Sequence, residues 1–299
     1  MTVLVTGASG LIGRHAVQVL LEQGERVRTF QRGTPPDDRV EFVHGDVRTD
    51  TLELCRAARD CKAVVHLAGR GDVGESRRDP VGYAQLNATG ALNALESART
   101  NGALFILASS QRVYPLKPTP CHEDEPPAPD SPYGYAKWVA ELWCRMASEH
   151  FGVTTRVLRF FSVYGPGQQA NGGSGVVSIF AQAALRGEPL VVQSAGRRDF
   201  TDVRDVARAI ATTVEQPNDG THRVYNIATG VGTTFRELAD AVVDIAGSSS
   251  RIEEHIQEPP GRDLVADTRC AEAELGFRGQ IHLNHGLEHY LEWLARSSA

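Results

Sequence analysis

The sequence lacks the features that mark several protein classes. None of its apolar runs approaches the roughly 18 residues that span a membrane. It has no run of lysines or arginines, and its formal net charge is −6, which argues against a general nucleic-acid binder. The opening residues 1–5 already have the pattern of a strand, which leaves no room for a signal peptide. We therefore expect neither a membrane nor a nucleic-acid partner.

Cysteine usage indicates the redox setting. The five cysteines are an odd number and show neither a Cys-x-x-Cys pair nor a spacing typical of a metal site. This pattern favours a reduced cytoplasmic protein without a bound metal. The 299 residues suffice for one large domain or two closely packed ones. A hydrophobic content of 41 % with 23 % charged residues is ordinary for a soluble globular enzyme.

Short apolar runs alternate with segments of helical periodicity in the first half of the chain. Strands are expected at 3–5, 26–30, 40–44, 63–67, 104–107 and 155–160. Helices are expected at about 11–23, 52–59, 82–99 and 138–150. This alternation predicts an α/β fold with a Rossmann-type doubly wound parallel sheet.

The alternation ends after Gly165, which suggests a second, smaller part of the molecule. We expect a dinucleotide-binding domain at 1–165 with a return element near 199–228, of which 224–227 crosses back into the main sheet. Residues 166–198 and 229–299 are expected to form a smaller C-terminal α/β lobe that binds substrate, with a flexible loop at 171–175. Such a lobe would cover the carboxyl ends of the strands, where open α/β sheets bind ligands.

A glycine-spaced turn follows the first strand and opens the first helix. Gly7, Gly10 and Gly13 stand three residues apart there. The first two let the backbone turn tightly and approach a pyrophosphate, and the third lets helix and strand pack closely. Free N–H groups at the helix start add positive potential. The pattern predicts a dinucleotide site that includes Gly7, Ser9, Gly10, Leu11, Ile12 and Gly13.

The residues at the end of the second strand bear on the choice between NAD and NADP. An acidic side chain there contacts the free ribose hydroxyls of NAD and repels a 2′-phosphate. This chain has Gln31 and Arg32 instead. Arg32 could pair with the 2′-phosphate of NADP, which is slightly favoured, whereas Gln31 could bond the ribose of NAD. Asp46, followed by Val47, could accept a hydrogen bond from the adenine amine.

A serine, a tyrosine and a lysine form the candidate catalytic set. Ser110 follows the strand at 104–107, and Tyr133 precedes Lys137 by four positions. A phenol has a pKa of about 10 in model peptides, which is too high for a base near neutral pH. A lysine ammonium one helical turn away favours the phenolate, so that Tyr133 can exchange a proton with a substrate hydroxyl. Ser110 can hold the same oxygen.

Ordered motifs along nearly the whole chain carry a family resemblance. They are Gly7-x-x-Gly10-x-x-Gly13, Gly45-Asp46, residues 66–69 and 73–76, Asn87-x-x-Gly90, residues 109–114, Tyr133-x-x-x-Lys137, and residues 159–167, 198–200 and 225–226. With them the chain resembles the extended short-chain dehydrogenase/reductases, specifically the NAD(P)-dependent nucleotide-sugar epimerase/dehydratase family. The segment 73–76 looks most like that of the UDP-glucose/galactose 4-epimerases.

The resemblance implies a mechanism and roles for individual residues. Tyr133 would remove the proton of a sugar hydroxyl while hydride passes from that carbon to the nicotinamide, and in an epimerase the 4-keto sugar would turn and receive hydride on its other face. The catalytic residues are then Ser110, Tyr133 and Lys137. Further implied cofactor contacts are Leu67, Ala68, Gly69, Asn87 and Lys137. Implied substrate contacts, with the diphosphate of a nucleotide sugar at the two arginines, are Val73, Ser110, Ser162, Arg198 and Arg262.

Departures from the family pattern narrow the reaction. Dehydratases of the family carry Asp-Glu directly after the catalytic hydroxyl, and decarboxylases carry Glu at the second of these positions. This chain has Gln111 and Arg112 there, so neither loss of water nor loss of carbon dioxide is expected. Ser162 stands where family members often have an asparagine that contacts the sugar nucleotide, which weakens the match on the sugar side.

The leading hypothesis is 4-epimerisation of a nucleotide-linked hexose. The alternative, which Arg32 favours, is an NADPH-dependent reductase of a nucleotide-linked 4-keto-hexose. Two further hypotheses are a dehydrogenase or reductase of a non-sugar substrate and a non-catalytic protein that senses NAD(P). The intact Ser110, Tyr133 and Lys137 argue against the last. By resemblance, the helix at 82–99 and the helix that carries Lys137 form a dimer contact, so a homodimer is expected.

Overall fold

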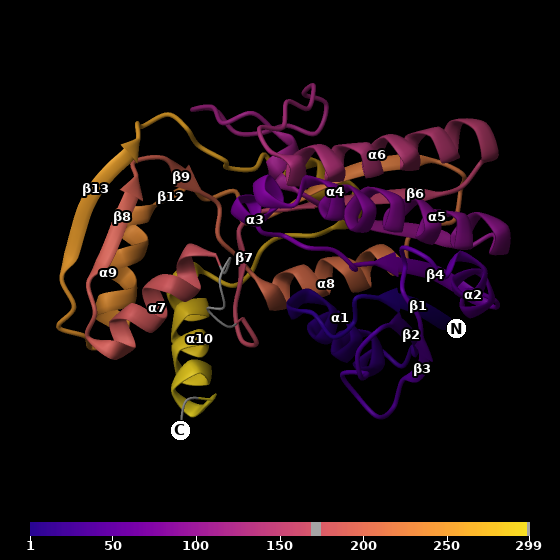
Figure 1. Cartoon of the computed structure of the whole chain (residues 1–299), viewed down its shortest axis with the longest axis horizontal. Coiled ribbons are helices and arrows are strands. Elements are labelled where there is room, and N and C mark those ends of the chain that lie inside the picture. The colour runs from indigo at the N-terminus through magenta and orange to yellow at the C-terminus, as the bar shows by residue number, and fades with distance from the viewer. Residues whose placement is uncertain (169–174, 298–299) are drawn as a thin grey trace.

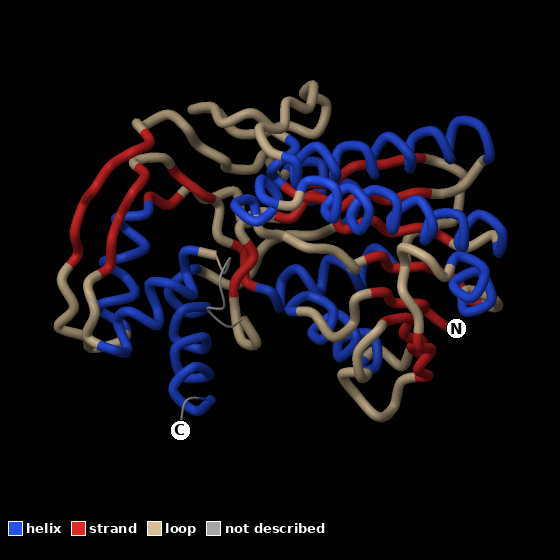
Figure 2. Tube along the Cα trace, in the orientation of Figure 1, coloured by secondary structure: helices blue, strands red, loops and turns tan. Residues whose placement is uncertain are grey.

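A seven-stranded parallel sheet forms the larger part of the molecule (Figures 1 and 2). The computed structural model describes residues 1–168 and 175–297, so the predicted loop at 171–175 lies, except for Gly175, outside the described residues. All neighbouring strands of the sheet run parallel, in the order β11-β6-β5-β4-β1-β2-β3. The predicted Rossmann-type doubly wound α/β fold is confirmed. The strands of the sheet are β1 (Thr2–Thr6), β2 (Arg26–Gln31), β3 (Glu41–His44), β4 (Cys61–His66), β5 (Leu104–Ser110), β6 (Thr155–Phe160) and β11 (His222–Ile227).

Helices cover both faces of this sheet because its central strands are apolar on both sides. β1 and β5 are buried at every residue, as is usual for central parallel strands. Val3 and Val5 belong to the apolar layer under α1 and α8, whereas Leu4 belongs to the layer under α2, α5 and α6 (Figure 1). No helix in the described part of the chain is long and apolar enough to cross a membrane. The covering helices are α1 (Leu11–Glu22), α2 (Thr51–Ala57), α5 (Gly90–Asn101), α6 (Pro132–Phe151) and α8 (Val203–Val214).

Two helical segments near the site begin earlier than the sequence predicts. α6 begins at Pro132 instead of 138, because Ser131 caps it by accepting a hydrogen bond from the Gly134 N–H at 3.3 Å. Proline suits the first helical position, where its missing N–H costs no hydrogen bond. Tyr133 therefore lies in the first turn of α6 and Lys137 in the second. The helix predicted at 82–99 consists of α4 (Pro80–Tyr83), a π-helical segment η1 (Ala84–Thr89) and α5.

The second half of the chain builds a smaller lobe at the other end of the molecule (Figure 1). In it, β8 (Leu190–Ser194) pairs in parallel with β13 (Ile252–Glu258), and three helices share a separate apolar cluster with β8. β11 returns beside β6 in the main sheet, as predicted for 224–227. The domain boundaries given above stay a prediction. The remaining elements are α3 (Val73–Arg78), η2 (Gln111–Val113), β7 (Val163–Tyr164), α7 (Val176–Arg186), β9 (Arg197–Arg198), β10 (Thr201–Asp202), β12 (Thr233–Thr234), α9 (Phe235–Ile245), η3 (Ala271–Leu275) and α10 (Leu283–Ser297).

Candidate active site

The carboxyl ends of β1, β4 and β5 meet at one edge of the sheet, and most predicted site residues lie there. β1 has β2 on one side and β4 on the other, so the strand order reverses at this point. Ligands of open α/β sheets bind at such a switch point. The glycine turn follows β1, the segment 67–69 follows β4, and Ser110 ends β5. The fold thus gathers groups from three separate stretches of the chain.

The turn between β1 and α1 forms a cradle of backbone. Gly7 has a φ of +69°, and a Cβ added to it would lie 2.5 Å from the backbone nitrogen of Ala68. A Cβ on Gly13 would overlap the carbonyl oxygen of Gly7. Gly10 is the N-cap of α1, and no side chain caps the helix there, so the N–H groups of 11–13 are available to an anion. The cradle fits the pyrophosphate of a dinucleotide cofactor.

The end of β2 presents one engaged side chain and one exposed side chain. Gln31 is buried; its Oε1 accepts a hydrogen bond from the Ser9 N–H at 3.1 Å and its Nε2 donates to a carbonyl of the next loop at 2.6 Å. Arg32 is 66 % exposed and lies 3.9 Å from the carboxylate of Asp46. Asp46 is held chiefly by Arg48, whose hydrogen bonds lower the pKa of Asp46 to about 2. Of these side chains, Arg32 is the one free to meet a phosphate.

The segment after β4 is fixed by Asn87 from η1. Asn87 accepts a hydrogen bond from the Arg70 N–H and donates one to the Arg70 carbonyl oxygen, both at 2.9 Å. A Cβ on Gly69 would lie 2.8 Å from Oδ1 of Asn87 and 3.4 Å from Nζ of Lys137. Asn87 therefore positions the segment 67–69 against Lys137, and both of its hydrogen bonds serve the backbone.

Ser110 and Tyr133 are brought together where α6 packs against η2. Ser110 is 6 % exposed, and its hydroxyl accepts a hydrogen bond from the Arg112 N–H at 3.2 Å. Gly134 allows the contact, since a Cβ there would overlap the carbonyl oxygen of Arg112. Burial raises the pKa of Tyr133, while a hydrogen bond with Ser110 and then the charge of Arg112 lower it. The charge of Arg112 thus favours the phenolate form of Tyr133, a role that its place in the sequence does not indicate.

Lys137 lies between the end of β5 and the segment that follows β4. It is 6 % exposed, and burial lowers the pKa of its ammonium to about 8. Its Nζ donates a hydrogen bond to the Ala108 carbonyl oxygen at 2.8 Å. The same Nζ lies 3.4 Å from the position that a Cβ on Gly69 would take. Lys137 therefore faces the strand ends next to the glycine cradle; its contact with a nicotinamide ribose stays a prediction.

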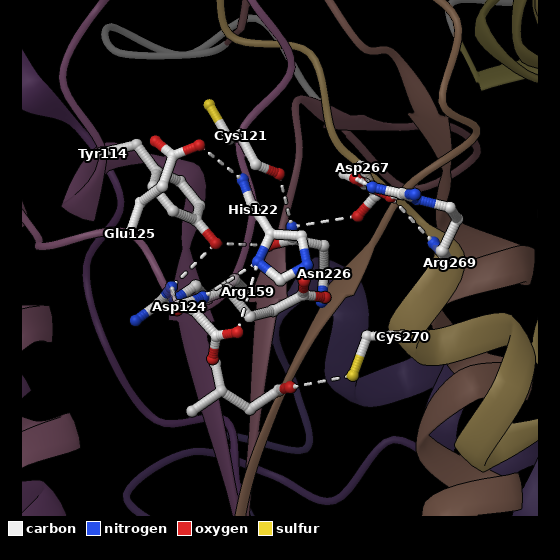
Figure 3. A network of polar contacts seen from close by, with 12 residues as sticks. Tyr114, Cys121, His122, Asp124, Glu125, Arg159, Asn226, Asp267, Arg269 and Cys270 are labelled. Carbon is white, nitrogen blue, oxygen red and sulfur yellow. Dashed lines mark hydrogen bonds and ion pairs between the residues drawn. The ribbon is translucent and has the colours of Figure 1, made fainter.

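A buried polar network ties α6 to the sheet beside these residues, and Figure 3 shows the part of it around Tyr114, Arg159 and Asn226. Glu141 of α6 pairs with Arg159 of β6 at 2.6 Å and accepts a hydrogen bond from the hydroxyl of Ser109, the neighbour of the candidate catalytic serine. Arg159 also donates to the Tyr114 hydroxyl at 2.7 Å, which donates to Asn226 of β11 at 2.8 Å. The network links α6 to β5, β6 and β11 and so fixes the helix that carries Tyr133 and Lys137.

Arg198 and Arg262 come from separate segments and lie next to each other; their role at a diphosphate stays a prediction. Arg198 is 5 % exposed, donates to the Arg262 carbonyl at 2.8 Å and lies over the Phe235 ring, 5.3 Å from its centroid. Burial, followed by the charge of Arg112, lowers the pKa of Arg198 to about 10. The carboxylate that pairs with it, from Glu258, is 3.7 Å away. This weakly paired, buried cation suits an anionic group such as a diphosphate.

Ser162 and Gln111 border the site on the side of the smaller lobe. Ser162 has a φ of +20°, which is uncommon for a residue other than glycine. Gln111 donates from Nε2 to the Ser162 hydroxyl at 2.9 Å, and its buried Oε1 has no hydrogen-bond partner among the described residues. From the sequence, Gln111 and Arg112 bear only on the reactions that the chain is not expected to catalyse. Their place directly after Ser110 is the signal that could have shown them to be site residues.

The sheet, the glycine cradle at its switch point and the Ser–Tyr–Lys set define a dinucleotide-dependent enzyme of the short-chain dehydrogenase/reductase type. The model of the NAD dependent epimerase/dehydratase family matches residues 3–228, and the chain belongs to this family.

Three similar proteins show how far the likeness extends. A UDP-glucose 4-epimerase of Mycolicibacterium smegmatis is 31 % identical to this chain, and the alignment covers 100 % of both proteins. A solved UDP-glucose 4-epimerase of Thermotoga maritima, with UDP-glucose, is 31 % identical with a TM-score of 0.90 over 100 % of both chains. MoeE5 in complex with UDP-glucuronic acid and NAD is 32 % identical, with a TM-score of 0.90 over 99 % of this chain and 100 % of MoeE5.

Proposed function

We propose that the protein is a nucleotide-sugar 4-epimerase in which Ser110, Tyr133 and Lys137 carry out reversible hydride and proton transfer at a sugar carbinol. The observation that supports this most directly is the convergence of the three side chains beside the glycine cradle. The names of similar proteins, UDP-glucose 4-epimerases among them, support a nucleotide sugar as substrate.

The chain's own residues handle the proton and the position of the sugar. A bound nicotinamide dinucleotide supplies a reversible hydride acceptor. Tyr133, as phenolate, takes the proton of the C4 hydroxyl, and Ser110 holds that oxygen. Tyr133 returns the proton after the keto sugar has turned, which inverts C4 when hydride comes back on the other face. Arg198 and Arg262 anchor the diphosphate meanwhile, so the keto sugar stays bound, with Val73 and Ser162 on the substrate side.

For the cofactor we propose NAD or NADP, with NADP slightly favoured. No carboxylate ends β2 to repel a 2′-phosphate, Gln31 is already engaged with Ser9, and Arg32 is 66 % exposed. Solved proteins of similar fold contain NAD. Replacing Arg32 with alanine should weaken NADP binding about 10- to 100-fold while leaving NAD binding unchanged, because a charge-assisted hydrogen bond contributes about 1.5–3 kcal/mol. Equal loss of both cofactors would contradict the assignment.

The alternative is an NADPH-dependent 4-keto-sugar reductase, which the same Arg32 favours. The two functions differ in how they use the cofactor, since an epimerase regenerates it in every turnover and a reductase consumes it. We would denature the purified protein and measure the released dinucleotide. Retained NAD(H) or NADP(H) supports the epimerase; a protein that takes up NADPH stoichiometrically and turns over only with a keto sugar supports the reductase.

The catalytic assignment is tested with Tyr133→Phe. The variant should lose turnover in either function and keep its affinity for the cofactor, because only the phenol oxygen is removed. Turnover that survives the substitution would contradict the role given to Tyr133.

We also propose a homodimer that forms through α5 and α6. Tyr135 and Leu142 stand seven positions apart on one face of α6 and are 52 % and 36 % exposed. Sedimentation equilibrium should give twice the chain mass, and Leu142→Glu should shift the protein toward a monomer.

The expected reduced cytoplasmic setting stays a prediction.

A further inference from the structure

Arg112 differs from the other arginines in the described residues, 1–168 and 175–297. It is half-buried, and its guanidinium makes neither a hydrogen bond nor an ion pair there. Every other buried or half-buried arginine in this part of the chain donates to a carboxylate or a carbonyl oxygen. A half-buried guanidinium without a protein partner keeps its charge and its donors available to an anion. Arg112 can therefore bind an anion that the described chain does not provide.

The position of Arg112 is fixed by the catalytic elements. Its N–H donates to the Ser110 hydroxyl at 3.2 Å, and its carbonyl oxygen fits against Gly134, the neighbour of Tyr133. Its charge acts on two groups: it lowers the pKa of Tyr133 and, after burial, that of Arg198. Arg112 is thus near the reacting end of the site, while Arg198 is the arginine assigned to the diphosphate.

Gln111 provides a second unpaired group beside it. The side chain is 7 % exposed, its Nε2 donates to Ser162, and its buried Oε1 has no partner among the described residues. A buried acceptor of this kind is unfavourable until a donor reaches it. Two consecutive residues after Ser110 therefore offer a cationic donor and an acceptor that the described protein groups leave unused. Such a pair fits a ligand with both an anionic group and a hydroxyl.

We propose that Arg112 binds a carboxylate on the sugar and that the substrate is a nucleotide-linked hexuronate. The inference rests on the proposed function, which places C4 at Tyr133. In a hexuronate the carboxylate is carried by C5, the ring carbon next to C4, so it lies close to the reacting atom and away from the diphosphate at C1. Arg112 meets this carboxylate and Gln111 accepts from a ring hydroxyl. A neutral hexose would leave Arg112 without a partner.

The test measures binding separately from turnover. Titration calorimetry with UDP-glucuronate, UDP-glucose and UDP is done on the cofactor-loaded Tyr133→Phe protein, so that no reaction occurs. The same titrations are repeated on Tyr133→Phe proteins that also carry Arg112→Met or Arg112→Lys. Arg59→Met is the matched control, because Arg59 is exposed and its guanidinium is unpaired among the described residues. In parallel, the otherwise unmodified enzyme is assayed for 4-epimerisation of both UDP-sugars.

We expect UDP-glucuronate to bind at least about tenfold more tightly than UDP-glucose, and Arg112→Met to remove about 10- to 100-fold of its affinity. Affinity for UDP-glucose and UDP should change by less than about threefold, Arg112→Lys should restore part of the loss, and Arg59→Met should change nothing. If Arg112→Met weakened the binding of UDP equally, Arg112 would serve the diphosphate and the proposal would be overturned. Equal affinities for UDP-glucuronate and UDP-glucose would overturn it as well. Failure of the enzyme to convert either sugar would instead overturn the proposed function.

Discussion

Gly134→Ala is expected to damage catalysis by moving Tyr133 rather than by removing any reacting group. The new Cβ would overlap the carbonyl oxygen of Arg112 and lie 2.8 Å from Cβ of Pro129. Ordinary contact begins at 3.4 Å, so α6 must move about 0.6 Å away from Pro129 and further than that from η2, which carries the Arg112 carbonyl oxygen. That displacement separates Tyr133 from Ser110. Because a misplacement of about 1 Å can cost about 100-fold in rate, we expect kcat to fall about 30- to 100-fold.

Stability should change much less than the rate. Overpacking costs about 1–3 kcal/mol, and alanine recovers about 1 kcal/mol over glycine in a helix, so a net loss of up to about 2 kcal/mol is expected. The assay combines steady-state kinetics, cofactor binding and urea unfolding. Ala136→Gly is the control, since it weakens the same turns of α6 without a new contact. The proposed displacement of Tyr133 is refuted if Ala136→Gly lowers kcat as much as Gly134→Ala does, or if Gly134→Ala keeps full activity.

Three further predictions follow from the buried groups. Gly13→Ala should abolish dinucleotide binding in a fluorescence titration, because its Cβ would overlap the Gly7 carbonyl; retained binding would exclude this cradle as the cofactor site. Glu141→Gln should lower the free energy of unfolding in urea by about 3 kcal/mol, because it leaves Arg159 charged and buried; a loss below about 1 kcal/mol would contradict this. The pKa of Lys137 is lowered from 10.5 to about 8 by burial, so between these pH values the unfolded chain binds a proton that the folded chain does not. Between pH 8 and 10.5 the free energy of unfolding should therefore rise by about 3 kcal/mol more in the wild type than in Lys137→Met. Parallel curves of unfolding free energy against pH for the two proteins would refute this prediction.

The main sheet could be predicted from the sequence because each of its strands is a short apolar run between turn signals. Residues 63–67 and 104–107, for example, are strands β4 and β5 to within three residues at either end. The start of α6 could not be predicted from apolar periodicity, because Pro132 and Gly134 interrupt it. There the cap by Ser131 and the tight packing against η2 decide the conformation.

The parts of the candidate site that depend on the spacing of residues along the chain could be predicted from the sequence. The parts that depend on which tertiary partner a side chain contacts could not. Gly7 to Gly13 lie in one turn and the helix start that follows it, and Tyr133 and Lys137 lie in one helix, so their spacing in the chain fixes their spacing in the fold. Gln31, by contrast, looked free to bond a ribose, but its amide is taken by Ser9 and the next loop. Whether a polar side chain is engaged depends on tertiary contacts that no local pattern records.

The electrostatics of Tyr133 joins the two proposals. The cation that lowers the pKa of the phenol is Arg112 and not Lys137, which the spacing predicts; the ammonium of Lys137 is hydrogen-bonded to the Ala108 carbonyl oxygen. A carboxylate bound to Arg112 would neutralise part of that charge and let the pKa of Tyr133 rise. The pH at which kcat reaches half its plateau should then be higher with a uronate than with a neutral hexose. One arginine would thus select the substrate and set the pH at which its proton is removed.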